Sequence, residues 1–136
     1  MQPKKPILLV EDSEANTPVA KHALDELGIS NRLISASVPE AMHYLRTPGE
    51  QRPGVVVLSV DDAGEDGLAA LRTIKQDDQL RSIPVVVLGP SGDSRMIDES
   101  FGLGAAGYMT KSSDQLEFAA TMRTLYEYWS LSELPK

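Results

Sequence analysis

The sequence of 136 residues has no cysteine and only two histidines, His22 and His43. Without cysteine the chain can form neither disulfide bonds nor a thiolate zinc site, and two histidines are too few for a metal cluster built from imidazole ligands. Long apolar runs are missing as well, because the run ILLV at residues 7–10 is far shorter than a signal-peptide core or a membrane span. These absences predict a soluble cytoplasmic protein.

Positive charge is also scarce. The chain has 13 Lys and Arg against 20 Asp and Glu, a formal net charge of −7, and no basic cluster offsets this excess. Binding to duplex nucleic acid depends on neutralising phosphates with Lys and Arg, so nucleic acid is not an expected partner. The length suits one domain with a real core, and we expect residues 1–136 to form it without an output domain.

Short apolar runs alternate with helical patterns along the whole chain. Continuous β-branched runs are typical of strands that are buried on both faces of a parallel sheet. Three such runs are clear, at 7–10, 55–58 and 84–88. Two weaker candidates of the same kind lie at 32–36 and 107–109.

Five helices are expected between and after these strands. The first extends from a Ser13 N-cap to a Gly28 stop, and the others cover 39–46, 67–76, 94–103 and 113–129. The alternating order of strand and helix predicts an α/β protein with a doubly wound parallel sheet in a three-layer αβα sandwich. In this architecture ligands bind at the carboxyl ends of the strands.

Residues at those strand ends are therefore candidates for a site. Glu11 and Asp12 follow the first strand, Ser59 closes the third, Gly89 closes the fourth and Lys111 lies just past the fifth. Two adjacent carboxylates suit a hard divalent cation such as Mg²⁺. The alternative is that Glu11 and Asp12 are only helix N-terminal charges favoured by the macrodipole, and that Lys111 is a solvated lysine.

The sequence resembles the receiver domains of two-component response regulators, the CheY-like superfamily, over essentially the whole chain. ILLVEDSEAN is similar to the family's first strand and acidic pair, IKQDDQLRSIPVVVL to its third helix and fourth strand, and GAAGYMTKSSD to its fifth-strand segment. The resemblance implies a flavodoxin-like (βα)5 fold with strand order 2-1-3-4-5. It places Glu11 and Asp12 at the magnesium-binding positions, Lys111 at the invariant lysine and Tyr108 at the aromatic switch.

One subgroup shares further features with this chain. The stand-alone regulators of the cyanobacterial-phytochrome-partner type have KS after the fifth strand and an aromatic, Trp-containing end, which the segment YEYWSLSELP resembles. The resemblance implies a signalling protein as partner, either a histidine kinase or a downstream target.

Two positions depart from the family pattern. The phosphate-accepting aspartate falls on Ser59, and the switch Thr or Ser falls on Gly89. A serine hydroxyl is a poor nucleophile unless a base activates it, and Gly89 has no hydroxyl to hold a phosphoryl oxygen. We therefore expect a degenerate phosphorylation site in a phosphorylation-independent binding module that is not an enzyme. With only Glu11 and Asp12 against Lys111, any Mg²⁺ should bind weakly and optionally, and Lys111 can pair directly with either carboxylate.

The alternative is a working receiver that accepts a phosphoryl group from a histidine kinase on a displaced aspartate, Asp61 or Asp62. Residues two apart in a strand share a face but are separated by about 6.6 Å, which exceeds what a carboxylate can recover while staying in line with Lys111. Asp61 matches the position whose backbone carbonyl ligates the metal in the family. Both aspartates are also compatible with a solvated acidic loop. A flavodoxin-like ligand binder is a third class, but no glycine-rich phosphate loop supports it.

The last helix carries the best candidate for a partner surface. One apolar stripe is expected to pack on the sheet and consists of Phe118, Met122, Leu125 and Trp129. Four of the seven aromatic residues lie between 118 and 129, and interfaces favour Tyr and Trp as anchors. We expect Tyr108, Tyr126 and Trp129 to contribute to a face formed by residues 94–129 that binds a second copy or a signalling partner. The alternative is that the C-terminal segment folds back and buries these rings.

The small residue at position 89 also has a consequence for the aromatic switch. Gly89 leaves space into which Tyr108 can settle permanently, so we expect Tyr108 to hold a single rotamer and the protein to occupy one state.

Overall fold

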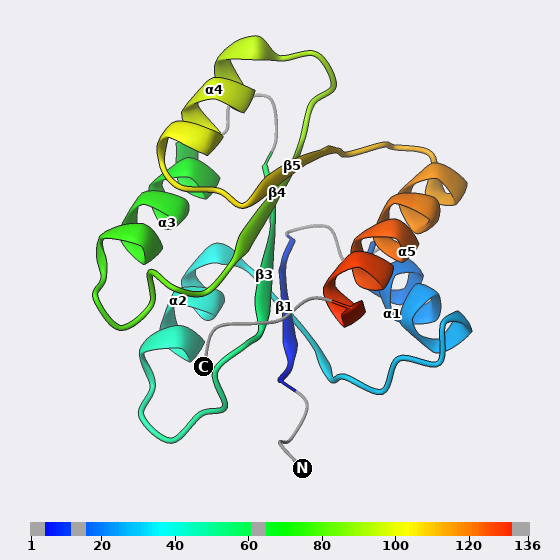
Figure 1. The fold of residues 1–136 in the computed structure, drawn as a ribbon, viewed down its shortest axis with the longest axis horizontal. Coiled ribbons are helices and arrows are strands. Elements are labelled where there is room, and N and C mark those ends of the chain that lie inside the picture. The colour runs from blue at the N-terminus through cyan, green and yellow to red at the C-terminus, as the bar shows by residue number, and fades with distance from the viewer. Residues whose placement is uncertain (1–4, 12–15, 61–64, 132–136) are drawn as a thin grey trace.

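The computed structural model describes residues 5–11, 16–60 and 65–131, in which five strands alternate with five helices (Figure 1). The strands are β1 (Ile7–Val10), β2 (Leu33–Ala36), β3 (Val55–Ser59), β4 (Val85–Gly89) and β5 (Gly107–Thr110). The helices are α1 (Asn16–Glu26), α2 (Val38–Arg46), α3 (Glu65–Gln76), α4 (Ser94–Gly102) and α5 (Gln115–Leu131). None of these helices is long and apolar enough to span a membrane.

All five strands run parallel in one sheet, in the predicted order β2-β1-β3-β4-β5. Parallel neighbours need crossover connections, which place helices on both faces of the sheet and explain why the strand sequences are continuous apolar runs. Every residue of β1 and β4 is buried. The two edge strands, β2 and β5, are more exposed.

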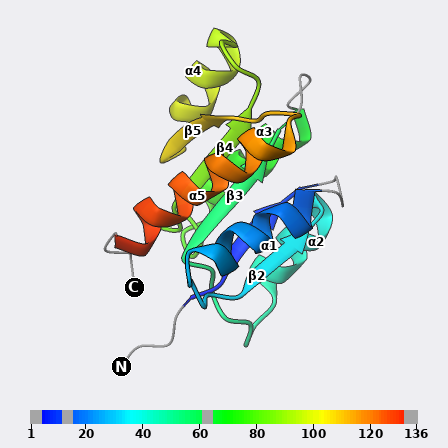
Figure 2. The same cartoon turned by 90° about the vertical axis from the view of Figure 1, so that its right-hand side faces the viewer.

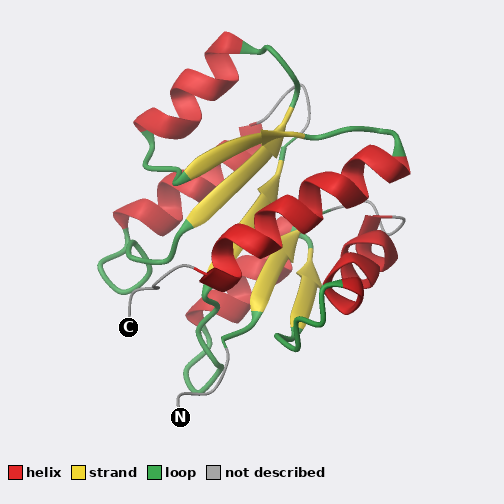
Figure 3. Cartoon of the chain, turned by 45° about the vertical axis from the view of Figure 1, so that its right-hand side comes forward, coloured by secondary structure: helices red, strands yellow, loops and turns green. Residues whose placement is uncertain are grey.

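The helices cover the sheet in two layers, with α1 and α5 on one face and α2, α3 and α4 on the other (Figures 1 and 3). Successive strand residues point to opposite faces. Leu8 and Val56 therefore pack against the layer of α2, α3 and α4, whereas Leu9 and Val57 pack against α1 and α5. This arrangement confirms the predicted three-layer sandwich.

Local signals explain several helix boundaries. Ser37 and Glu40 form a capping box at the start of α2, and the Asp93 side chain caps α4 by accepting from the backbone N–H of Met96. Gly28 adopts a φ of 68° after α1, which confirms the predicted stop. The expected N-cap Ser13 lies outside the described residues.

Candidate functional site

The carboxyl ends of the strands bring most of the predicted site residues to one edge of the sheet. Glu11 directly follows β1, Ser59 and Gly89 end β3 and β4, and Lys111 directly follows β5. The Lys111 backbone N–H donates to the Gly89 carbonyl at 2.8 Å, which joins the ends of β4 and β5. Asp12 and the proposed alternative acceptors, Asp61 and Asp62, lie outside the described residues.

The Glu11 carboxylate is buried and held on both oxygens. Its side chain is 3% exposed, and Lys111 Nζ lies 3.1 Å from Oε1. The side-chain amide of Asn16 donates to Oε2 at 3.2 Å. The prediction that Lys111 pairs directly with a carboxylate is confirmed for Glu11. No sequence pattern had singled out Asn16, which contributes only because α1 begins beside the end of β1.

The Ser59 hydroxyl has no base beside it among the described residues that could activate it as a nucleophile. Its Oγ is buried and has no hydrogen-bond partner in the part of the chain that the structure describes. An unpartnered buried hydroxyl costs about 1–3 kcal/mol relative to a hydrogen-bonded one. Both histidines are exposed on α1 and α2, so neither provides a base for this hydroxyl.

Tyr108 occupies the space that a side chain at position 89 would need. A Cβ atom added to Gly89 would lie 2.8 Å from Tyr108 Cζ, closer still to its hydroxyl, and 2.9 Å from Cγ2 of Val60. The Tyr108 hydroxyl donates to the Pro90 carbonyl at 2.7 Å. Burial, and secondarily the negative charge of Asp93, raises the pKa of the Tyr108 phenol above its ordinary value. The ring is therefore turned inward against β4.

The described residues fit a divalent cation poorly. No group of three or more His, Asp or Glu side chains that could hold a metal occurs within residues 5–11, 16–60 and 65–131. Glu11 is the carboxylate that the structure places at the site, and both of its oxygens already accept from Lys111 and Asn16. Ser59 supplies a neutral hydroxyl where a third carboxylate would strengthen metal binding.

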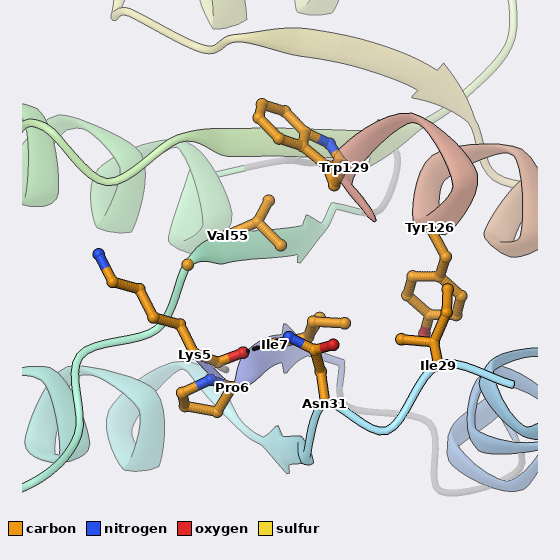
Figure 4. Close-up of a pocket in the computed structure, with 9 residues that line it drawn as sticks. Lys5, Pro6, Ile7, Ile29, Asn31, Val55, Tyr126 and Trp129 are labelled. Carbon is orange, nitrogen blue, oxygen red and sulfur yellow. Dashed lines mark hydrogen bonds between the residues drawn. The ribbon is translucent and has the colours of Figure 1, made fainter. Parts of the chain in front are cut away.

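The prediction that Tyr126 belongs to a partner surface is wrong. Tyr126 is 1% exposed, and its ring contributes to a cavity of about 40 Å³ beside Ile7, Ile29 and Asn31 at the amino ends of β1 and β3 (Figure 4). Burial raises the pKa of its phenol above the ordinary range. Tyr126 follows Leu125 and so lies about 100° around the helix from it, and it belongs to the core cluster of the layer formed by α1 and α5.

Trp129 and Tyr128 take different positions at the end of α5. Trp129 is partly buried and packs against the core layer of α1 and α5, as its place in the predicted stripe requires. Tyr128 is 65% exposed and meets the Trp129 ring edge to face, with ring centroids 5.1 Å apart. The exposed aromatic side chain of this segment is therefore Tyr128, and Trp129 is mainly a core residue.

Comparison with known proteins agrees with the fold. The family model described as "Response regulator receiver domain" matches residues 7–123. Response regulator Rcp1 of Synechocystis sp. is 33% identical over 132 residues, covering 93% of this chain and 90% of that protein. The Mn²⁺-bound structure of Rcp1 superposes with a TM-score of 0.86 at 31% identity and covers 97% of this chain and 99% of the other.

A second solved structure extends the comparison to the phosphorylated form of a relative. The phosphorylated cyanobacterial phytochrome response regulator RcpA gives a TM-score of 0.87 at 32% identity, covering 98% of this chain and all of the other. The family model, the relatives and the shared sheet order agree. The chain belongs to the response regulator receiver domains of two-component signalling.

Proposed function

We propose that this receiver works without phosphorylation, as a binding module rather than an enzyme. The observation that carries the proposal is the Ser59 hydroxyl, which is buried, has no partner among the described residues and stands where the family resemblance expects the acceptor aspartate. Lys111, which the resemblance places at the invariant lysine, is paired with Glu11. Gly89 adds no hydroxyl that could hold a phosphoryl oxygen.

The switch then has one preferred state. A ligand shifts an equilibrium only through a difference in affinity for the two states. In this chain the inward Tyr108 ring fills the space beside Gly89 and is fixed by its hydrogen bond to Pro90. We therefore expect the inward arrangement to be the preferred state of the switch.

Treatment with acetyl phosphate and Mg²⁺ is expected to leave the mass of the protein unchanged. Beryllofluoride should likewise leave its NMR spectrum unchanged, because position 59 has a serine and therefore no acceptor carboxylate. A Ser59→Asp variant is the matched control that restores the carboxylate. A stable acyl phosphate mapped to Asp61 or Asp62 would establish the alternative function, a receiver that uses a displaced aspartate.

Magnesium binding is expected to be weak and to improve in the same Ser59→Asp variant. The third carboxylate adds negative charge and an oxygen ligand beside Glu11, which should raise the affinity on the order of tenfold. Isothermal titration of both proteins with Mg²⁺ measures this difference. Equal affinities would show that position 59 does not face the cation. The Mn²⁺-bound form of Rcp1 supports the choice of a divalent cation as ligand.

The partner surface that we propose is the side of α5 that faces β5. Arg123 pairs with Glu26 of α1 at 3.7 Å, so the Arg123 side of α5 faces α1. Tyr128 follows Tyr126 by two residues, about 200° around the helix, which places it on the flank of α5 away from α1. Figure 2 shows β5 and α4 on that side of α5. A second copy, or a signalling protein such as a histidine kinase, would bind there. The similarity to RcpA, a cyanobacterial phytochrome response regulator, favours a phytochrome as the class of partner.

Self-association is expected for the wild type and should weaken at least about tenfold in a Tyr128→Ala variant, because exposed aromatic anchors dominate interface energies. Leu116→Ala is the matched control, since Leu116 is 81% exposed on the same helix but on another side. Sedimentation velocity over a range of concentrations measures the association. A wild type that stays monomeric throughout would eliminate the second copy and leave a foreign partner for this face.

A further inference from the structure

A second surface lies at the opposite edge of the sheet, along β2. A groove of about 570 Å³ runs between this strand and α2. It is lined from the strand by Ile34 and Ala36, from the helix by Pro39 and His43, and by further polar residues. Figure 2 shows β2 at the margin of the molecule, between α1 and α2.

The backbone of β2 has hydrogen-bonding groups that point away from the sheet. Ile7 N–H donates to the Arg32 carbonyl at 2.8 Å, and Glu11 N–H donates to the Ala36 carbonyl at 3.0 Å. In a parallel pair the residues that face the neighbouring strand alternate with residues that face the other way. The N–H and C=O groups of Leu33 and Ser35 therefore point outward, and no described strand pairs with them.

The groove is lined by apolar and neutral polar side chains and by two carboxylates, Glu40 and Glu50. Pro39 and His43 are one helical turn apart and form the α2 wall. Glu40 lies near the carboxyl end of β2, and Glu50 follows α2 and so lies near the amino end. Glu40 accepts the Ser37 N–H in the capping box, and no Lys or Arg in the described ranges pairs with Glu40 or Glu50.

We propose that this groove binds an extended peptide segment of a partner protein, with small apolar or β-branched residues in the centre and a basic residue at each end. The segment would add a sixth strand by pairing with Leu33 and Ser35, while its alternate side chains enter the groove. Its basic residues would meet Glu40 and Glu50. Specific recognition of this kind combines backbone hydrogen bonds with complementary charge.

A second copy of the chain does not suit the groove. Two-fold pairing of two β2 edges would bring the Glu40 and Glu50 carboxylates of both copies to one interface. The carboxylates of Glu40 and Glu50 attract a basic segment, which is therefore the occupant that the charges favour.

The test uses the fluorescein-labelled peptide Lys-Val-Thr-Val-Thr-Lys and fluorescence anisotropy with the full chain. Ser35→Pro removes the outward N–H but leaves the pairing of β2 with β1, because proline is tolerated at a strand edge. Ser35→Ala is its matched control, since both variants lose the side-chain hydrogen bond to Thr17 and only the proline variant loses the amide. We expect Ser35→Pro to bind the peptide at least about tenfold more weakly than Ser35→Ala.

A charge variant tests the same surface without altering a strand. Glu50 is exposed and lies outside the helices and strands, so Glu50→Lys should preserve folding. It is expected to weaken peptide binding several-fold and to reduce its dependence on salt. Asp98→Lys on α4 makes the same change in net charge far from the groove and should have a smaller effect.

Four outcomes would overturn the proposal. The first is equal binding by Ser35→Pro and Ser35→Ala, which would exclude pairing at the strand edge. The second is an equal loss in Glu50→Lys and Asp98→Lys, and the third is no binding by the wild type at millimolar peptide. The fourth is a dimer of the wild type that only Ser35→Pro dissociates, which would make a second copy the occupant.

Discussion

Replacing Gly89 with alanine is expected to expel the Tyr108 ring from the edge of the sheet and to lower the free energy of unfolding by about 2 kcal/mol. The added Cβ would lie under 3 Å from Tyr108 Cζ and from Val60 Cγ2, so the neighbours must move. The Val60 methyl is close to the backbone and has little freedom, whereas the Tyr108 ring can rotate outward. That rotation breaks the hydrogen bond to Pro90 and exposes the ring.

The readout is the titration of the Tyr108 phenol together with chemical denaturation. Burial raises the pKa of Tyr108 in the wild type, so an expelled ring should titrate closer to the ordinary value of about 10. NMR of a protein labelled on the tyrosine ring follows this group directly. Gly107→Ala is the matched control on β5, because a Cβ there would meet only Val86 at 4.0 Å.

A double variant separates the clash from other effects of the alanine. Tyr108→Ala removes the ring that Gly89→Ala displaces, so the two changes together should cost less than the sum of the single changes. Additive costs, with the Tyr108 pKa unchanged in Gly89→Ala, would show that the ring does not depend on the glycine. The proposed single state of the switch would then lose its structural basis.

The sequence predicted the fold well because the strands are buried on both faces. Continuous β-branched runs such as ILLV and VVVL are typical of central parallel strands, and the helical patterns between them match the crossovers that a parallel sheet needs. Convergence of the strand ends followed from the same pattern, which is why the pairing of Glu11 with Lys111 could be anticipated. Their distance of 3.1 Å depends on the crossover geometry and needed the structure.

Features that depend on helix rotation were harder to predict. Tyr126 and Tyr128 are two residues apart and similar in chemistry, yet one is buried and the other is 65% exposed. The hydrophobic stripe of α5 showed which side of this helix packs on the sheet. It did not show which of the two adjacent sides packs against α1. Asn16 was missed for a related reason, because its contact with Glu11 follows from the position at which α1 starts.

The two edges of the sheet differ in a way that bears on binding. β5 carries the switch tyrosine Tyr108 and the neighbouring α5 carries the exposed Tyr128, so association at this edge would be coupled to the Tyr108 rotamer. At β2 the outward amides of Leu33 and Ser35 lie far from the switch, beside a groove lined by two carboxylates. A partner at β2 would therefore bind independently of the state of Tyr108. The Gly89→Ala variant can test this independence, since it should leave peptide binding at β2 unchanged.

Tyr126 gives the largest expected effect on stability and the sharpest contrast between two substitutions. Tyr126→Ala should lower the free energy of unfolding by about 3–5 kcal/mol, because it removes a fully buried ring next to an existing cavity. Tyr126→Phe keeps the ring and removes a buried hydroxyl that has no hydrogen-bond partner among the described residues. It should therefore be neutral or stabilise the protein by up to about 1 kcal/mol.

The difference in stability between the wild type and Tyr126→Phe should increase at high pH. Burial raises the pKa of the Tyr126 phenol, so the folded state retains this proton after the unfolded state has lost it. Stability from this group is fully present below the unfolded pKa of about 10 and is lost above it, by up to about 1.4 kcal/mol per pH unit. Tyr126→Phe should lack this loss, and urea denaturation from neutral to alkaline pH measures the difference. A phenylalanine variant that is clearly less stable at neutral pH would show instead that the hydroxyl has a partner in the folded protein.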